Sequence, residues 1–261
     1  MDTRIYVCTH KTYTKPEDDL YRTLHVGHKI SDDLGYEGDD TGDHISDRNK
    51  SFCELTGIYW IWKNVSCDIV GICHYRRYFI KDEDFLKKED IEEILSSGYD
   101  VILPACGFTK SKTVSSHYAK EHYKKDLDTV RSIIAELYPE YIPAFDLSMH
   151  CNLISPWNML ITKKEIFQEY CSFIFSVLFE AEKRIDISHY DSFQGRIFGY
   201  LSERLIRVWF LMHTYRIYEI PVRQINPEDA YNQQTALNTI ERLLYLKIND
   251  LLTIYRSGNY I

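Results

Sequence analysis

The sequence predicts an α/β fold in which a central, mostly parallel sheet is flanked by helices. Short runs rich in β-branched and aromatic residues alternate with longer segments whose apolar residues recur at helical spacing. The 261 residues can bury a substantial core. Because no linker, repeat or low-complexity tract divides the chain, we expect one domain over residues 1–261.

The expected strands are short runs, most of them bounded by turn-forming or polar residues. The first is RIYVCTH, at the N-terminus, and the second is the buried run CDIVGIC. In chain order, we expect strands at residues 4–10, 67–73, 99–104, 158–162 and 215–222.

The expected helices lie between these strands. We expect them at residues 50–64, 90–98, 126–140, 163–185 and 193–213, and from Pro227 onward. Gly98 suits the end of the second helix. The last helix carries an apolar stripe from Leu237 to Tyr255 that we expect to dock on the sheet, with dimerisation and contact with a membrane as alternatives. The stretch from Gly35 to Asn49 is rich in Gly and Asp, which predicts a long loop with a functional role.

Charge and cysteine content exclude several classes of protein. The net charge is −8, with 31 Lys and Arg against 39 Asp and Glu, so we expect no nucleic-acid partner and only local anion binding. Seven cysteines without a C-x-x-C pair, and an N-terminus without an apolar leader, favour a cytoplasmic protein. Apolar runs are shorter than the roughly 20 residues of a spanning helix, although peripheral contact with a membrane stays open.

Basic and hydrogen-bonding side chains follow two of the predicted strands. The strand at 67–73 runs into His74, Arg76 and Arg77, and the first strand ends in Thr9, His10 and Lys11. Ligands bind beyond the carboxyl ends of strands in an open α/β sheet, and the arginine fork suits phosphate. These residues therefore favour an anion. On one strand the two arginines would face opposite ways, and the alternative, in which both form ion pairs that close a sheet edge, stays open.

Several long blocks carry a resemblance to a known family. They are YVCTHK, GDDTGDHISDRNKSFCELTGIYWIWKN, CHYRRYF, WNMLITKKEIFQEYCSFIFSVLFEAEKRID and YDSFQGRIFGYLSERLIRVW. In this order they span nearly the whole chain, which resembles the bacterial capsular and exopolysaccharide glycosyltransferase family, originally catalogued as a domain of unknown function.

The resemblance implies a GT-A-like, Rossmann-like fold and an inverting transfer of a sugar from a UDP-activated donor. The acceptor would be lipid-linked or an oligosaccharide, as part of a capsular, exopolysaccharide or O-antigen repeat. Galactofuranose is the donor sugar associated with relatives. The expected location is the cytoplasm, at the inner face of the membrane. No pattern in the sequence indicates the linkage or an oligomeric state.

Negative charge grows on the departing diphosphate, so a cation must stabilise it. Many GT-A enzymes hold a metal ion with Asp-x-Asp at a strand end, whereas this strand ends in His-Tyr-Arg-Arg. We therefore expect His74, Arg76 and Arg77, with Lys11 as a further candidate, to replace the metal, so that no cofactor is required. The literal Asp126-Leu127-Asp128 falls on a predicted helix, where its carboxylates diverge. Loop aspartates are the alternative site for Mg²⁺ or Mn²⁺, namely Asp32, Asp33, Asp39, Asp40, Asp43 and Asp47.

An inverting transfer needs a general base, and Asp191 is our candidate. It precedes a predicted helix, so an N-cap is its alternative role, and Asp186 and Glu203 are reserves. We assign the donor-binding site to Thr9, His10, Lys11, Asp43, Asp47, Asn64, Asn158 and Gln194.

Two other readings compete with the glycosyltransferase. One is a non-catalytic nucleotide-binding or scaffold protein of a polysaccharide assembly complex. The other is a phosphotransferase or hydrolase with His74 as its nucleophile and the two arginines on phosphate.

Overall fold

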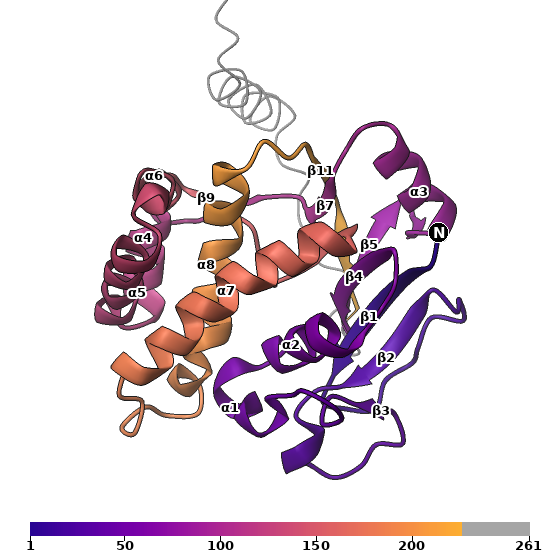
Figure 1. The fold of residues 1–261 in the computed structure, drawn as a ribbon, viewed down its shortest axis with the longest axis horizontal. Coiled ribbons are helices and arrows are strands. Elements are labelled where there is room, and N and C mark those ends of the chain that lie inside the picture. Colours follow the sequence, from indigo (N-terminus) through magenta and orange to yellow (C-terminus); the bar gives the residue numbers. More distant parts are fainter. Residues whose placement is uncertain (226–261) are drawn as a thin grey trace, which may run out of the picture.

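The structure is a computed structural model, and it describes residues 1–225 (Figure 1). The helix predicted from Pro227 onward, with its stripe from Leu237 to Tyr255, lies outside the described residues. The strands are β1 (Thr3–Thr9), β2 (Tyr21–His25), β3 (Glu37–Gly38), β4 (Ile69–His74), β5 (Arg77–Lys81), β6 (Asp84–Phe85), β7 (Val101–Pro104), β8 (Gly107–Phe108), β9 (Leu153–Ile154), β10 (Leu160–Lys163), β11 (Ile217–Ile220) and β12 (Val222–Gln224).

Eight α-helices and four 3-10 turns connect the described strands. The helices are α1 (Asn49–Phe52), α2 (Leu55–Asn64), α3 (Lys88–Ser96), α4 (Val114–Glu121), α5 (Lys124–Leu137), α6 (Ile142–His150), α7 (Lys164–Arg184) and α8 (Ile197–Met212). The 3-10 turns are η1 (His28–Ile30), η2 (Ser46–Arg48), η3 (Pro139–Tyr141) and η4 (Gln194–Arg196). None of the helices in residues 1–225 is long and apolar enough to span a bilayer.

The main sheet has the strand order β11, β7, β10, β4, β1, β2, β3. β1 runs parallel to β2 and β4, and β10 runs antiparallel to both of its neighbours. The register places Cys8 opposite His74 and Thr9 opposite His25, so three neighbouring strands end at one level. This mixed, mostly parallel sheet confirms the predicted α/β class.

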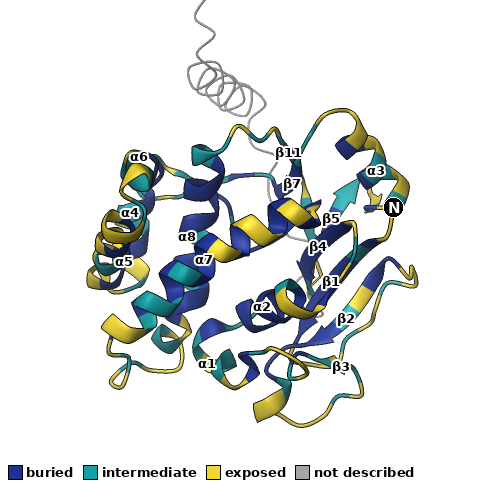
Figure 2. Cartoon of the chain, viewed as in Figure 1, coloured by how far each residue is buried: buried dark blue, intermediate teal, exposed yellow. Residues whose placement is uncertain are grey.

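Alternate residues of the strands face two apolar layers. Tyr6 and Cys8 of β1 pack with α2, α7 and α8, which Figure 1 shows on one side of the sheet. Ile5 and Val7 pack on the other face with α3 and the β5–β6 hairpin. Figure 2 shows β1 and β4 almost wholly buried, so the sheet centre is a rigid base for the loops at its rim.

All five predicted strands are present, but three predictions need correction or extension. The helix predicted at 50–64 is two helices, because Cys53 takes a φ of 52° and interrupts it before α2. The strand predicted at 67–73 is β4, and the basic residues that follow it form a hairpin with β5. The chain turns over Tyr75 and Arg76, and Arg77 pairs antiparallel with His74 at the start of β5. The two arginines therefore do not alternate along one strand.

The sequence prediction missed β2, whose YRTLH run is short, and the helices α4 and α6. β2 is stabilised mainly by its pairing with β1 along its whole length, from Tyr21 to His25. Such pairing depends on a partner far away in the sequence, and the local pattern of apolar residues is too short to indicate it.

We predict that Gly71→Ala destabilises the fold. Gly71 lies between Ile5 and Ile161 on the neighbouring strands, and an added Cβ would come within 2.9 Å of a Cγ1 atom of each. Overpacking of this kind costs about 1–3 kcal/mol, which should appear as a lower free energy of unfolding in urea denaturation. Gly195→Ala is the matched control, because an added Cβ there meets nothing within 4 Å. Equal stability of the two variants would contradict the prediction.

Candidate functional site

A cavity of about 910 Å³ opens at the carboxyl ends of β1 and β4. On the sheet side its wall is formed by His10, His74, Tyr75, Arg76 and Arg77. The predicted convergence of the two strand ends at one rim is therefore present, and the β4–β5 hairpin delivers both arginines to the same space.

The opposite wall is formed by two segments that directly precede helices, one before α2 and one before α8. Cys53 and Glu54 line the cavity at the break between α1 and α2. Asp191, Gly195 and Arg196 line it from the loop and the 3-10 turn that precede α8. The cavity thus lies between the sheet rim and the starts of two helices.

Neither Arg76 nor Arg77 has an ion pair or a side-chain hydrogen bond within residues 1–225. Both are partly buried, and the Nε atom of each is buried without a hydrogen-bond partner. Their guanidinium groups lie 5.0 Å and 5.1 Å from the ring centres of Tyr75 and Trp157, respectively. The alternative of arginines paired with carboxylates at a sheet edge is therefore not found in the described part of the chain.

A third guanidinium group faces the same space. Arg196 Nε donates to Cys53 Sγ at 3.3 Å, and its guanidinium lies 5.5 Å from the Tyr200 ring centre. Like the other two, Arg196 forms no carboxylate pair among the described residues. Three cations without a paired anion at one cavity favour a ligand with several negative charges.

Burial changes the protonation of the groups on the sheet wall. It lowers the pKa of Arg77, although the charges of Glu54 and Glu203 act in the opposite direction. Burial also lowers the pKa of His74, which favours its neutral form. The Nε2 atom of His74 lies 2.7 Å from the carbonyl oxygen of Trp157, which can only accept, so Nε2 carries the proton. His74 therefore orients the site more than it adds positive charge.

Glu54 is a carboxylate of the cavity wall that is absent from the predicted site. Its Oε1 accepts a hydrogen bond of 2.7 Å from the Nδ2 of Asn158. Asn158 also donates to the Gly199 carbonyl at 3.2 Å and accepts from Ser202 Oγ at 2.8 Å. Treating residues 50–64 as one helix hid Glu54, whereas the break at Cys53 brings it to the cavity. The only local signal is an acidic residue between Phe52 and Leu55, inside the apolar helical pattern.

Asn158 and Gln194 were assigned to donor binding, and the structure places both in the protein framework. Asn158 is 1% exposed, and its amide joins α2, β10 and α8 through the bonds above. Gln194 Oε1 lies 3.1 Å from His122 Nδ1, and its Nε2 donates to the Glu121 carbonyl at 2.9 Å. Neither residue lines the cavity.

Asp191 both caps a turn and lines the cavity. Its Oδ1 accepts from the backbone N–H groups of Phe193 and Gln194 at 2.9 Å and 2.7 Å. Its Oδ2 accepts no hydrogen bond from the described residues. The reserves differ, because Asp186 accepts from Ser188 N and Glu203 is bonded to Arg204 and to the Trp157 N–H. Only Asp191 of these three lines the cavity.

The remaining donor-site candidates are divided between the rim and the loops. His10 is exposed and lines the cavity, whereas Thr9 is buried and bonds to the backbone of Lys11, which is exposed. Asn64 bonds through its side-chain amide to the backbone of Asp43, and this contact fixes the loop to α2. Thr9, Lys11, Asp43 and Asn64 are outside the cavity lining.

Asp47 is exposed in the first turn of η2 and is also outside the cavity lining. The Asp-x-Asp sequence diverges as expected from its helix. Asp126 is buried and accepts from Tyr190 OH, whereas the exposed Asp128 pairs with Lys124 at 2.6 Å. These two carboxylates therefore do not face a common ligand.

The comparisons with known proteins agree with this architecture. No curated protein matches the chain. A solved structure described as the bifunctional glycosyltransferase WbbM in its apo form is similar over 91% of this chain, with 29% sequence identity and a TM-score of 0.78. The match covers 47% of the WbbM chain, so the chain spans about half the length of that protein.

The sheet order and the flanking helices therefore belong to a fold that is found in a glycosyltransferase. A model of one protein family matches residues 4–214, which include every residue of the cavity wall. The chain belongs to this family, which is described as a domain of unknown function, DUF4422.

Proposed function

We propose that the chain is a glycosyltransferase that takes a sugar from a UDP-activated donor and holds the diphosphate with Arg76 and Arg77. The observation that carries the proposal is the pair of partly buried guanidinium groups at the cavity, without carboxylate partners in residues 1–225. The likeness to WbbM, described as a bifunctional glycosyltransferase, supports the reaction class.

Burying a cation costs free energy. A guanidinium withdrawn from water loses hydration, and an anionic ligand offsets that loss with charge-assisted hydrogen bonds. The nucleoside diphosphate supplies such an anion, and its negative charge increases as the sugar departs. Guanidinium groups that are already in place stabilise that charge most strongly at the transition state. The clamp needs no metal ion, and Arg196 on the opposite wall is its third member.

The acceptor hydroxyl must lose a proton in an inverting transfer. Two carboxylates line the cavity within the described chain, those of Glu54 and Asp191. We propose Asp191 as the base, because its Oδ2 accepts no hydrogen bond from the described residues and its backbone contacts fix the carboxylate at the cavity. Glu54, held by Asn158, is the second candidate.

Finer details of the proposal rest on the family resemblance of the sequence blocks. The proposed sugar is galactofuranose. The proposed acceptor is lipid-linked or an oligosaccharide and belongs to a capsular, exopolysaccharide or O-antigen repeat. The proposed location is the inner face of the cytoplasmic membrane. The electrostatics of the cavity support the diphosphate but do not select the sugar.

We predict that the chain binds UDP without a metal ion. Titration calorimetry in excess EDTA should detect UDP binding, and Arg76→Ala and Arg77→Ala should each weaken it about 10- to 100-fold. A hydrogen bond to a charged group contributes about 1.5–3 kcal/mol, and about 1.4 kcal/mol corresponds to a factor of ten. Arg131→Ala is the matched control, because Arg131 is exposed and pairs with Asp146 outside the cavity.

Two outcomes would contradict this clamp. Binding that requires Mg²⁺ or Mn²⁺ would transfer the role to a metal ion. Equal loss of affinity in the Arg131→Ala control would show that the effect is not specific to the cavity. Binding of UDP without any transfer to an acceptor would instead favour the non-catalytic alternative.

Substitution of the two cavity carboxylates should separate their roles. With UDP-galactofuranose and a synthetic lipid-linked oligosaccharide, Asp191→Asn should lower kcat by about 10²- to 10⁴-fold, because that is the usual contribution of a general base. The Asn side-chain oxygen can still accept the two backbone hydrogen bonds, so denaturation should show near-native stability. Glu54→Gln, the matched variant, should keep kcat within about tenfold of the native value. A larger loss in Glu54→Gln than in Asp191→Asn would assign the base to Glu54.

A further inference from the structure

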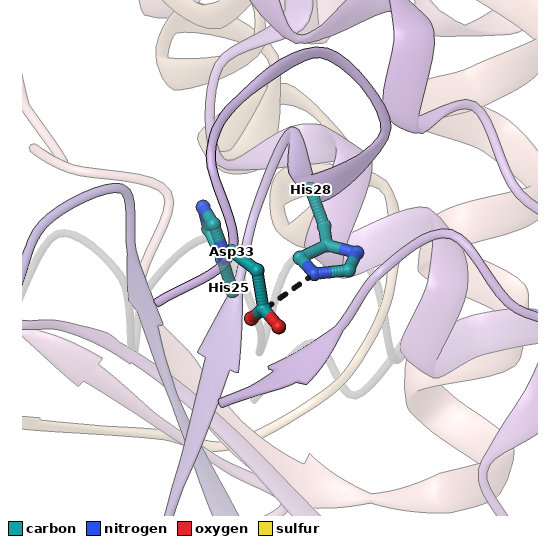
Figure 3. A group of neighbouring side chains, drawn as sticks. All are labelled: His25, His28 and Asp33. Carbon is teal, nitrogen blue, oxygen red and sulfur yellow. Dashed lines mark ion pairs between the residues drawn. The ribbon is translucent and has the colours of Figure 1, made fainter. Parts of the chain in front are cut away.

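A second group of chemically reactive side chains lies where β2 ends. His25, His28 and Asp33 each offer one ligand atom, and these atoms lie within 4.8 Å of one another (Figure 3). None of the three lines the cavity. They share no residue with the proposed diphosphate clamp, and their imidazole and carboxylate donors differ in kind from its guanidinium groups.

The backbone that carries the two histidines is held in place by a buried carboxylate. Gly27 takes a φ of 73° and turns the chain from β2 into η1. Asp39, which is fully buried, accepts from the N–H groups of Gly27 and His28 at 3.0 Å and 3.2 Å. Ser46 Oγ also donates to Asp39. The position of the His28 backbone therefore does not depend on a ligand.

The imidazole of His28 lies between two carboxylates. Its Nδ1 forms an ion pair with Asp40 Oδ1 at 2.9 Å, although the angle is not that of a hydrogen bond. Its Nε2 lies 3.5 Å from Asp33 Oδ1, which is long for a hydrogen bond. Two donors on one tetrahedral zinc ion, with bonds of about 2.0–2.2 Å, are about 3.3 Å apart. The Nε2–Oδ1 spacing is therefore close to that of two ligands of one ion.

His25 supplies the third donor from the buried side. Its side chain has no solvent exposure, and its ring centre lies 5.0 Å from that of His28. One ring nitrogen, Nε2, is 3.0 Å from Ser31 Oγ, whereas Nδ1 has no hydrogen-bond partner within residues 1–225. A buried polar atom without a partner is costly, and a metal ion at this cluster would give the His25 ring a ligand.

Access from solvent comes through the other two residues. The side chain of Asp33 is 73% exposed and that of His28 is 25% exposed. An ion could therefore enter over Asp33 while His25 closes the inner side, and water could occupy a fourth position. Asp40 Oδ1 lies 2.9 Å from His28 Nδ1, the ring nitrogen that would face away from the ion, and a carboxylate in that position can orient a ligating imidazole.

We propose that His25, His28 and Asp33 form a binding site for a divalent transition-metal ion, and that this ion is Zn²⁺. Two imidazoles and one carboxylate suit Zn²⁺ and its neighbours in the first transition series, whereas Mg²⁺ and Ca²⁺ prefer ligand sets of oxygen alone. The site differs in this respect from the hard-cation site considered for the loop aspartates.

The test is titration of the full chain, freed of metal with a chelator, with Zn²⁺ against a competing fluorescent chelator. We expect one Zn²⁺ per chain, at least tenfold weaker binding in Asp33→Asn, and loss of this site in His28→Ala. Asp40→Asn should weaken binding about 10- to 100-fold, the usual effect of removing an outer carboxylate. The matched control is Asp32→Asn, because Asp32 is an exposed neighbour outside the cluster and should bind Zn²⁺ as the native chain does.

Co²⁺ provides a spectroscopic probe of the ligands. The expected spectrum has visible bands of a nitrogen- and oxygen-ligated ion and lacks the near-ultraviolet band of a thiolate, although the chain contains seven cysteines. Circular dichroism establishes that His28→Ala is folded, and the exposed Asp33→Asn gives an independent result if it is not. Absence of Zn²⁺ binding, a thiolate spectrum, or equal affinity in Asp33→Asn and Asp32→Asn would overturn the proposal. The cluster would then be an imidazolium held between Asp33 and Asp40.

Discussion

The cavity depends on one turn, formed by Trp157 and Asn158. Both residues have a positive φ, of 73° and 48°. The Trp157 carbonyl contacts His74, its ring lies under the guanidinium of Arg77, and the next residue, Asn158, holds Glu54. A single strained dipeptide thus positions three side chains from two walls. Because non-glycine residues adopt this conformation only at a cost, the contacts of the turn with β4, α2 and α8 must offset it.

The electrostatics of the cavity are opposite to those of the whole chain. The net charge is −8, yet three guanidinium groups line one space without carboxylate pairs among the described residues. Potential carboxylate partners are engaged elsewhere, since Glu203 pairs with Arg204 and Glu54 accepts from Asn158. The two carboxylates of the cavity wall, Glu54 and Asp191, form no ion pair with these guanidinium groups among the described residues, so the arginines stay available for an anionic ligand. The net negative charge of the whole chain repels anions, so only the local charge of the cavity favours anion binding.

The sequence was sufficient for the strands whose signal is local and insufficient for groups joined by distant contacts. Apolar runs predicted β1 and β4, and the alignment of their carboxyl ends correctly brought His10, Arg76 and Arg77 together. The break at Cys53 was missed because the apolar spacing continues through it. Asn158 was assigned to a ligand because its bonds to Glu54 and Ser202, which lie 104 and 44 residues away, leave no local pattern. His25 has no sequence signal as a metal ligand, because the five-residue run of β2 is too short to predict a strand.

The two proposed sites both lie at the rim where β2, β1 and β4 end at one level. The end of β4 carries guanidinium groups, which repel a divalent cation, whereas the segment after β2 carries carboxylates, which repel a diphosphate. Asn49 lies between them: it lines the cavity, and its Cγ would be 2.6 Å from a Cβ added at Gly27, in the turn before His28. The side chain of Asn49 also donates to the Cys53 carbonyl at 2.7 Å, so packing is continuous from the histidine turn to the helix break that carries Glu54. Opposite charge would therefore keep the two proposed ligands apart, while the shared sheet edge and Asn49 join both groups of side chains in one framework.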